Sequence, residues 1–236
     1  MTFKLCGMRS LALILALCNP GEALLNSTLW VQRAAEYRAS AVQSYAIARQ
    51  TLDAALPSSQ PAAVVLDLDE TALDNSRYAA RQLVQGKTFT FGDDWTAWVN
   101  ESAAAAVPGA VEFLRYAQSR GVTPVYITNR TTIHKAPTLV NLRKLGMPVS
   151  EETLIVRDDS STDKTARRNA VSARYHILLY LGDAMGDFPT DGDVPKIVVA
   201  NPMYGSWEKA ELRPAALPPL PSRSPCDDSP SGTTSR

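Results

Sequence analysis

Short apolar runs alternate with amphipathic segments along most of this chain, and each run ends abruptly at polar residues. Short runs rich in β-branched and aliphatic residues are typical of buried strands. Because strands that alternate with helical patterns form parallel sheets, we expect a doubly wound α/β fold with helices on both faces of the sheet. The expected strands are 64–66, 122–127, 153–156, 177–181 and 196–200.

A single long helix is expected over residues 27–56, before the first strand. Apolar residues recur there at three- and four-residue spacing and form one stripe. Ser27 is placed to cap the start of this helix, and Pro57 follows its end. We expect the stripe to pack over the edge of the core, with a homodimer interface as the alternative. The stripe consists of Trp30, Ala34, Tyr37, Ala41, Tyr45, Ala48 and Leu52.

The amino terminus has the pattern of an export signal. Lys4 and Arg9 precede an apolar run at 11–17, which is too short to span a bilayer, and small residues follow at a suitable cleavage site. We expect residues 1–23 to be removed, which would leave the protein periplasmic, associated with the outer membrane, or secreted. The signal also resembles a bacterial lipoprotein box, although Leu17 departs from that pattern. The lipoprotein alternative would anchor the protein to a membrane through Cys18.

Composition adds limits to this picture. The chain has 236 residues with 24 basic and 24 acidic side chains, and 45% of its residues are hydrophobic. This predicts one globular domain over 24–213 and a Pro- and Ser-rich tail without fixed structure over 214–236. A formal net charge of zero argues against binding of a nucleic-acid polymer. Cys6 and Cys18 lie in the signal and leave Cys226 alone, so neither a disulfide nor a zinc site is expected.

Two aspartates end the first expected strand. Asp67 and Asp69 are two residues apart, so both side chains would leave the carboxyl edge of the sheet on one face. Two carboxylates that close call for a metal, a proton or a cation, which favours chemistry over a solvated strand end. A calcium loop is excluded because Ala72 and Tyr78 occupy the positions that need Gly and Glu. Glycosyltransferases and two-metal nucleases, which also use this spacing, remain alternatives at this point.

Further polar residues follow the other expected strands. Thr128 follows the second strand, Lys164 follows the third, and Gly182 with Asp183 and Asp187 follows the fourth. The carboxyl ends of parallel strands meet at one edge of the sheet, where open α/β folds place their ligands. These side chains are therefore expected to meet Asp67, with Lys164 facing a phosphate.

An aromatic-rich segment follows the first acidic strand end. Four aromatic residues lie within ten positions of a chain that is only 7% aromatic. Core packing accounts for some of them, but an excursion of this kind could also form one wall of a substrate pocket. Trp95 is the residue we expect in such a wall. The four are Phe89, Phe91, Trp95 and Trp98.

Together, these motifs resemble the haloacid dehalogenase superfamily of phosphohydrolases. The sequence 67–71 resembles its first motif, Thr128 its second, Lys164 its third, and Asp183 with Asp187 its fourth. Similarity is greater still to one branch, the bacterial class C nonspecific acid phosphatases, some of which are outer-membrane lipoproteins. The segments that carry this similarity lie between residues 28 and 212 and include 30–37, 67–76, 94–99, 127–130 and 201–208.

The resemblance implies a magnesium-dependent phosphomonoesterase with a small cap over the sheet. In such an enzyme Asp67 would attack phosphorus and form an aspartyl-phosphate, and Asp69 would act as the general acid and base. Thr128 and Lys164 would neutralise the phosphoryl oxygens. The Mg²⁺ ligands would be Asp67, Asp69 (through its backbone carbonyl), Asp183 and Asp187.

The resemblance also implies substrates and alternatives. Small phosphomonoesters, including 5′-nucleotides, would be hydrolysed, with Trp95 and Tyr204 stacking against the base and Asn129 contacting the substrate. A phosphotransferase, in which an alcohol intercepts the aspartyl-phosphate, is one alternative. The other is a catalytically inactive surface-binding lipoprotein, which the intact catalytic positions disfavour.

Overall fold

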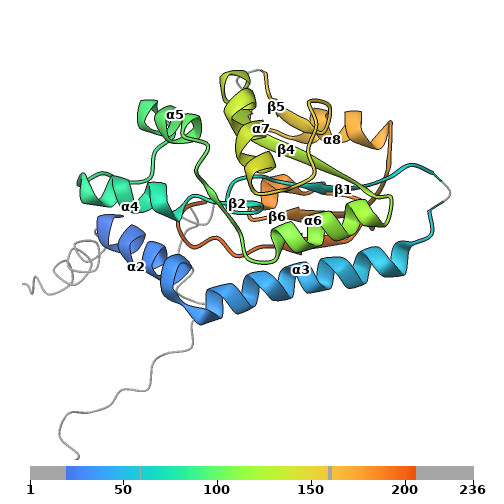
Figure 1. Ribbon diagram of the computed structural model, residues 1–236, viewed down its shortest axis with the longest axis horizontal. Helices are drawn as coiled ribbons and strands as arrows, with labels where there is room; N and C mark the ends of the chain where they lie inside the picture. The colour runs from blue at the N-terminus through green and yellow to red at the C-terminus, as the bar shows by residue number, and fades with distance from the viewer. Residues whose placement is uncertain (1–19, 59, 159–160, 206–236) are drawn as a thin grey trace, which may run out of the picture.

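Five parallel strands form the central sheet of the computed structural model, which describes residues 20–205 apart from 59 and 159–160 (Figure 1). Their order across the sheet is β5-β4-β1-β6-β7. The chain moves outward from β1 to β5 and then returns to the other side of β1, so the predicted doubly wound α/β fold is confirmed. The reversal places a crevice between the ends of β1 and β6. The strands are β1 (Ala62–Leu66), β4 (Thr123–Thr131), β5 (Leu154–Arg157), β6 (His176–Gly182) and β7 (Lys196–Val198).

Strand β4 departs from regular pairing near its end. Ile127 pairs with Ile155, but the next pair joins Thr131 to Arg157. Between these two pairs β4 therefore advances four residues and β5 only two. Extra residues of this kind bend a strand and change the direction in which its side chains point. The displaced residues are 128–130, which follow directly from the buried part of the strand.

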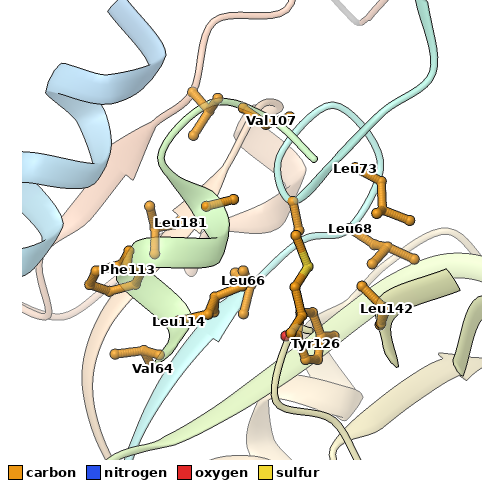
Figure 2. Close-up of a cluster of buried hydrophobic side chains, with 14 of the residues drawn as sticks. Val64, Leu66, Leu68, Leu73, Val107, Phe113, Leu114, Tyr126, Leu142 and Leu181 are labelled. Atoms are coloured by element: carbon orange, nitrogen blue, oxygen red, sulfur yellow. The ribbon is translucent and has the colours of Figure 1, made fainter. Parts of the chain in front are cut away.

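Helices cover both faces of the sheet. One face packs against α3 (Ala35–Ala55), α6 (Ala110–Ser119) and α7 (Lys135–Lys144), and the other against α8 (Thr165–Ser172). Figure 2 shows the larger cluster, in which α6 and α7 side chains meet the inward side chains of β1 and β4. This burial is the main contribution to stability. Labelled members of the cluster include Val64, Leu66, Phe113, Leu114, Tyr126 and Leu142.

The expected single helix before β1 is two helices, which corrects the sequence prediction. Helix α2 (Pro20–Arg33) ends where Ala34 adopts an extended conformation, and α3 begins at Ala35. Ser27 is not a helix cap, because its hydroxyl donates to the Ala23 carbonyl at 2.9 Å inside α2. The break separates two packing partners: α2 contacts α4, whereas α3 lies along the sheet beside α6 (Figure 1).

The part of the predicted stripe that lies in α3 is buried, which confirms its packing on the core, whereas Trp30 lies in α2 and is 37% exposed. The buried side chains of α3 contact the sheet and α6. The buried residues are Tyr37, Ala41, Tyr45, Ala48 and Leu52.

A small cap lies between β1 and α6 in the chain, and it stands beside the carboxyl edge of the sheet (Figure 1). It consists of two short helices and a two-stranded antiparallel pair. The sequence indicated the aromatic segment but not the α5 helix that carries it. The elements are β2 (Leu73–Asp74), α4 (Ser76–Val84), α5 (Asp93–Asn100) and β3 (Ala105–Ala106).

Several sequence predictions fall outside the described residues. These are the export signal up to residue 19, all three cysteines and the tail over 214–236. Residues 20–23 lie in the first turn of α2. Of the helices in the described ranges, none combines the length and hydrophobicity that a membrane crossing requires.

Candidate active site

Three carboxylates meet where β1 and β6 end. Asp67 follows β1, Asp183 follows β6, and Asp187 ends the short helix η2 (Met185–Asp187). Each offers an oxygen within 4.8 Å of those of the other two. Gly182, the last residue of β6, makes this approach possible, because a Cβ there would lie 2.5 Å from the Cβ of Asp187. The structure therefore brings together the residues that the sequence predicted at this edge.

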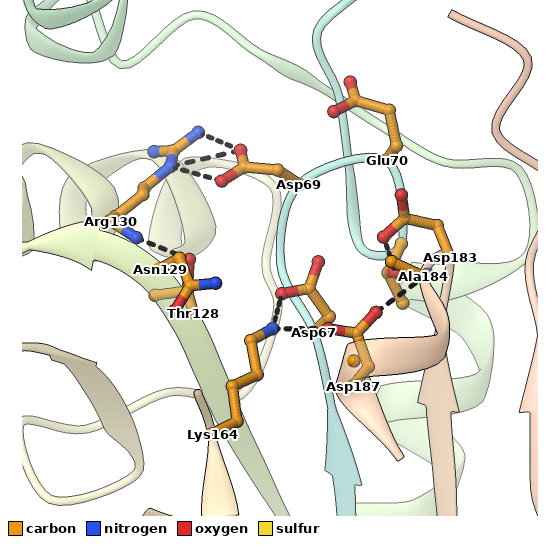
Figure 3. A network of polar contacts seen from close by, with 12 residues as sticks. Asp67, Asp69, Glu70, Thr128, Asn129, Arg130, Lys164, Asp183, Ala184 and Asp187 are labelled. Atoms are coloured by element: carbon orange, nitrogen blue, oxygen red, sulfur yellow. Dashed lines mark hydrogen bonds and ion pairs between the residues drawn. The ribbon is translucent and has the colours of Figure 1, made fainter. Parts of the chain in front are cut away.

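Lys164 enters the same cluster from the start of α8. Its side chain is only 4% exposed, and its ammonium group donates to Asp67 and, at 2.7 Å, to Oδ1 of Asp187 (Figure 3). One buried cation thus contacts two of the three carboxylates. Without such compensation, burying these charges would be strongly unfavourable.

Burial and mutual repulsion determine the ionisation of this cluster. Burial raises the pKa of the Asp67 carboxyl well above its usual range; Lys164 opposes the shift, and Asp187 adds to it. Burial, followed by repulsion from Asp187, raises the pKa of Asp183 to about 6. For Lys164, burial alone would lower the pKa, but the two neighbouring carboxylates outweigh it and raise the pKa. Ionising all three carboxylates is therefore unfavourable unless a cation lies among them, and this is a property of metal-binding sites.

The donor set suits a hard divalent cation. Asp183 is held by the side-chain amide of Asn201 at 2.8 Å and by the hydroxyl of Thr71 at 3.2 Å. The backbone N–H of Ala184 donates to Asp187 at 2.9 Å. Among the described residues the cluster offers carboxylate oxygens alone, and such ligands suit hard cations such as Mg²⁺, Ca²⁺ or Mn²⁺. A metal ligand role for the backbone carbonyl of Asp69 stays a prediction.

The Asp69 carboxylate points away from this cluster and toward Arg130. Nε of Arg130 lies 3.1 Å from both carboxylate oxygens, and Nη2 lies 2.7 Å from Oδ1 (Figure 3). Asn75 donates to the same oxygen at 2.9 Å. The Arg130 side chain is 2% exposed and that of Asp69 is 15% exposed, so the pair is fixed at the border of the cavity. Arg130 lies in the segment 127–130 that carries the family similarity, but the sequence indicated no role for it.

The end of β4 supplies two of the predicted residues. Thr128 is fully buried, and its hydroxyl oxygen accepts the backbone N–H of Arg130 at 3.1 Å. Asn129 lines the cavity; its side chain donates to the Thr162 carbonyl at 3.1 Å and accepts from Arg167 at 2.7 Å. Both belong to the displaced segment of β4, but only Asn129 is among the residues that line the cavity.

Aromatic side chains from the cap and from the segment after β7 form one wall of the cavity. Trp95 and Tyr204 both line it, as the sequence analysis proposed. Trp95, however, is 3% exposed and lies under the guanidinium of Arg130, 5.4 Å from the ring centroid. Phe91 is 61% exposed and contacts both rings edge-on, at centroid distances of 5.2 and 5.5 Å. Phe91 is therefore the accessible ring, and only its position in the aromatic run indicated it.

Tyr204 is held by Glu70, which sequence analysis did not single out. The tyrosine hydroxyl donates to one carboxylate oxygen of Glu70, and the other oxygen accepts the backbone N–H of Asn75 at 2.9 Å. Glu70 is 2% exposed, and burial, followed by repulsion from Asp69, raises its pKa well above the usual range. It also has a positive φ of 59°. This contact fixes the aromatic wall against the strand end that carries Asp67.

These groups surround a cavity of about 340 Å³. Its volume falls within the range of small-molecule sites. Carboxylates and Lys164 form one end, the aromatic rings of Phe91, Trp95 and Tyr204 form one wall, and the ends of β4 and β5 add further polar residues. Those not predicted from the sequence are Arg130, Thr131, His134, Arg157 and Thr162.

The sequence matches the model of a known protein family. The model of the HAD superfamily, subfamily IIIB (acid phosphatase), matches residues 19–207. The chain belongs to this family. The family match extends over the sheet, the cap and every residue of the cavity described above.

Solved structures of this subfamily type agree with the fold. The class C acid phosphatase from Bacillus anthracis with tungstate bound is 36% identical and superposes with a TM-score of 0.75, covering 80% of this chain and 88% of that one. A second structure of the Bacillus anthracis enzyme gives 0.74 with the same identity and coverage.

Curated plant proteins are similar over a shorter region. Vegetative storage protein 2 of Arabidopsis thaliana is 25% identical over 148 residues, which are 59% of this chain and 55% of that protein. The stem 31 kDa glycoprotein of Glycine max is 28% identical over 151 residues, 59% of this chain and 58% of that protein. The chain therefore spans less than two thirds of these curated relatives.

Proposed function

We propose that this acid phosphatase family member is an exported, magnesium-dependent phosphomonoesterase that acts on small phosphate esters, including 5′-nucleotides, through an aspartyl-phosphate. The observation that carries the proposal is the position of Asp67 at the carboxyl end of β1. One of its oxygens contacts the Lys164 ammonium, and the side chain borders the cavity beside Asp183 and Asp187. The tungstate bound to the related Bacillus anthracis enzyme, a tetrahedral oxyanion like phosphate, agrees with this proposal.

In the first half-reaction, a carboxylate oxygen of Asp67 attacks phosphorus, and the bond from phosphorus to the leaving-group oxygen breaks. Asp69 donates a proton to that leaving oxygen. Arg130 holds the Asp69 carboxyl at the cavity border by contacts to both of its oxygens. The leaving group departs as a neutral alcohol, and the phosphoryl group remains on Asp67.

In the second half-reaction, water attacks the same phosphorus. Asp69, now a carboxylate, takes a proton from that water, and the bond from phosphorus to the Asp67 oxygen breaks. Inorganic phosphate leaves and Asp67 is restored. Lys164 would stabilise the phosphoryl oxygens in both steps, since its ammonium group contacts Asp67. Thr128, at the end of the neighbouring strand β4, would act with it.

Asp67, Asp183 and Asp187 would hold the Mg²⁺ ion, with the backbone carbonyl of Asp69 as a further ligand. When bound, the metal would supply positive charge for the phosphoryl oxygens and offset the repulsion among these carboxylates. The clustered oxygens and the raised pKa of Asp183 support this assignment. The hydrogen bonds from Asn201 and Thr71 would keep Asp183 in place as the metal binds or leaves.

The aromatic wall supports nucleotides as one substrate class. The exposed ring of Phe91 and the neighbouring ring of Tyr204, 5.5 Å apart between centroids, offer apolar surface to a base. Trp95 would pack against Phe91 and hold it in place, because the Trp95 ring is covered by the guanidinium of Arg130. Asn129 would contact the substrate from the opposite side of the cavity.

Release of phosphate from p-nitrophenyl phosphate and from a panel of nucleoside monophosphates tests the proposal. The assay is run with Mg²⁺ and repeated with EDTA. We expect release only with the metal, and higher kcat/KM for 5′-nucleotides than for esters without an aromatic group. A folded, metal-supplemented protein that releases no phosphate from any ester would overturn the proposal. Fractionation of expressing cells into periplasm, outer membrane and medium tests export and anchoring through Cys18.

A further inference from the structure

The cavity contains a third cation besides Lys164 and Arg130. It is Arg157, the last residue of β5, whose side chain lines the cavity together with Asn129 and Thr131. Lys164 contacts two carboxylates and Arg130 contacts Asp69, so both are held by the protein itself. Arg157 forms no ion pair with any residue in the described ranges.

The guanidinium of Arg157 is incompletely satisfied within the protein. Its Nε is buried and has no hydrogen-bond partner among the described residues. A buried donor without a partner is unfavourable, and more so when it belongs to a charged group. The neighbouring arginines on α8 differ, because Arg168 donates to the Gly186 carbonyl at 3.0 Å and Arg167 to Asn129 at 2.7 Å. Arg157 is therefore a cavity-lining cation without an ion-pair partner among the described residues, as expected of a side chain that binds an anionic ligand.

Position on the sheet separates Arg157 from the reacting phosphoryl group. β4 lies between β5 and β1, and neighbouring strands are about 4.8 Å apart, so the backbone of Arg157 is roughly 10 Å from the strand of the nucleophile. Lys164 and Thr128 lie nearer to Asp67 and would serve the phosphoryl group. Because Arg157 borders the same cavity from farther away, it would face the leaving group of a bound ester.

We propose that Arg157 binds a second anionic group carried by the leaving group of the substrate, so that the enzyme favours phosphomonoesters with a further carboxylate or phosphate. The inference rests on the proposed phosphomonoesterase function and adds a specificity determinant to it. A guanidinium suits this role because its planar array of donors matches the oxygens of a carboxylate or phosphate. Because the Arg157 side chain lines the cavity, its guanidinium is placed to meet such a group.

Binding to a variant that cannot turn over tests the proposal separately from catalysis. In an Asp67→Asn background, calorimetry measures the Kd values of phenyl phosphate, 4-carboxyphenyl phosphate and 1,4-phenylene bisphosphate. We expect the carboxylate ester, the bisphosphate or both to bind at least about tenfold more tightly than phenyl phosphate. Which of the two shows the larger gain identifies the preferred anion. Arg157→Gln should remove the gain and leave the Kd of phenyl phosphate within about twofold.

Two further variants provide controls. Arg157→Lys keeps the charge without the planar donor array and should retain only part of the gain. Arg143→Gln removes an exposed arginine on α7 and should change no Kd. The proposal is overturned if neither second anion tightens binding, or if the gain persists in Arg157→Gln. Turnover of phenyl phosphate by the unaltered enzyme reports on the phosphomonoesterase function itself, so the two failures are distinguishable.

Discussion

The guanidinium of Arg130 contacts both carboxylate oxygens of Asp69, through Nε at 3.1 Å and Nη2 at 2.7 Å. The remaining terminal nitrogen donates to the hydroxyl of Thr138 on α7 at 2.8 Å. Asp69 is therefore fixed to the scaffold by a buried group that comes from the displaced end of β4. In the proposed mechanism, Arg130 is a positioning residue for Asp69, the proposed general acid and base.

Replacing Arg130 should impair catalysis more than binding. Arg130→Lys keeps the charge but cannot contact both oxygens, and displacing a reacting group by about 1 Å can cost ~10²-fold in rate. We expect kcat for p-nitrophenyl phosphate to fall by roughly that factor with little change in KM. A purely structural role for Arg130 would instead lower the amount of folded enzyme, leaving kcat per folded molecule unchanged. Active-site titration with a slow oxyanion inhibitor distinguishes the two outcomes.

Asp67→Asn should abolish turnover and keep the fold. The amide has the shape of the carboxylate but lacks the nucleophilic oxygen, and loss of a nucleophile typically costs ~10³-fold or more in kcat. Asp191→Asn makes the same charge change at an exposed position and should keep full activity. Steady-state phosphate release, with circular dichroism to verify folding, is the measurement. Residual activity in Asp67→Asn above about a tenth of wild type would contradict the covalent mechanism.

Metal binding should stabilise the protein more at neutral than at acidic pH. The pKa of Asp183 is raised to about 6, so the metal-free native state binds more protons than the unfolded chain between its ordinary pKa of 3.8 and about 6. Stability of the metal-free protein therefore falls as pH rises through this window, and a cation that pairs with the ionised group restores it. We expect a larger increase in Tm from Mg²⁺ at about pH 7.5 than at about pH 5.

Asp183→Asn tests this prediction. The variant removes the ionisable group, so the metal-free protein should become less sensitive to pH in that window and the Mg²⁺-dependent increase in Tm should shrink at pH 7.5. Differential scanning calorimetry with and without EDTA supplies the data. An equal increase in Tm at both pH values in the unaltered protein would refute the link between Asp183 and the metal.

Phe91→Ala should discriminate between nucleotides and simple esters. The ring is exposed, so its removal leaves the core intact, whereas base stacking on an aromatic side chain is worth ~1–3 kcal/mol. We expect KM for a 5′-nucleotide to rise about fivefold or more, with KM for a small aliphatic phosphate unchanged. Val84→Ala, on the exposed surface of α4, is the matched control. Equal losses on both substrates would refute a stacking role for Phe91.

His134 should make the protein less stable as pH falls, which is the opposite of the pH dependence that Asp183 gives to the metal-free protein. It is buried between the cap and β4: Nε2 lies 3.1 Å from the Thr96 hydroxyl, and Nδ1 accepts the backbone N–H of Thr131 at 3.4 Å. Burial, then Arg130, lowers its pKa, and Asp69 opposes that shift. Its contribution to stability is therefore complete above the ordinary pKa of 6.5 and is lost as pH falls below that value.

Chemical denaturation between about pH 7.5 and pH 5 measures this contribution. We expect His134→Asn to reduce the loss of unfolding free energy on acidification. The chain contains one other histidine, His176, which is exposed, and His176→Gln should leave the pH dependence unchanged. An unchanged slope in His134→Asn would show that the bonds of His134 do not control the pH response.

The sequence predicted the sheet and the catalytic edge because both depend on local patterns. The apolar residues 64–66 have the pattern of a buried strand in a parallel sheet. Because right-handed crossovers keep neighbouring strands parallel, Asp67 and Asp183, which follow β1 and β6, lie at the same edge of the sheet. Lys164 was predicted from its position after the third expected strand, and the family motif agreed with it. Its contacts to two carboxylates required the coordinates.

Residues whose roles depend on tertiary packing were not predicted. The break at Ala34 has no sequence signal, since alanine favours helix; α2 and α3 diverge because they pack on different elements. The role of Arg130 follows from extra residues in β4 that reorient its side chain. Phe91 is exposed and Trp95 is buried because of how α5 packs in the folded chain, and the spacing of aromatic residues in the sequence does not determine that packing.

Trapping of the phosphorylated enzyme tests whether Asp67 is the nucleophile. Enzyme with Mg²⁺ is mixed with a ³²P-labelled phosphomonoester, quenched in acid within milliseconds, and digested for peptide mapping. The aspartyl-phosphate mechanism predicts one labelled peptide with the phosphoryl group on Asp67, released by hydroxylamine and absent from Asp67→Asn. Steady turnover with no label on Asp67 at any quench time, or label on another residue, would contradict it.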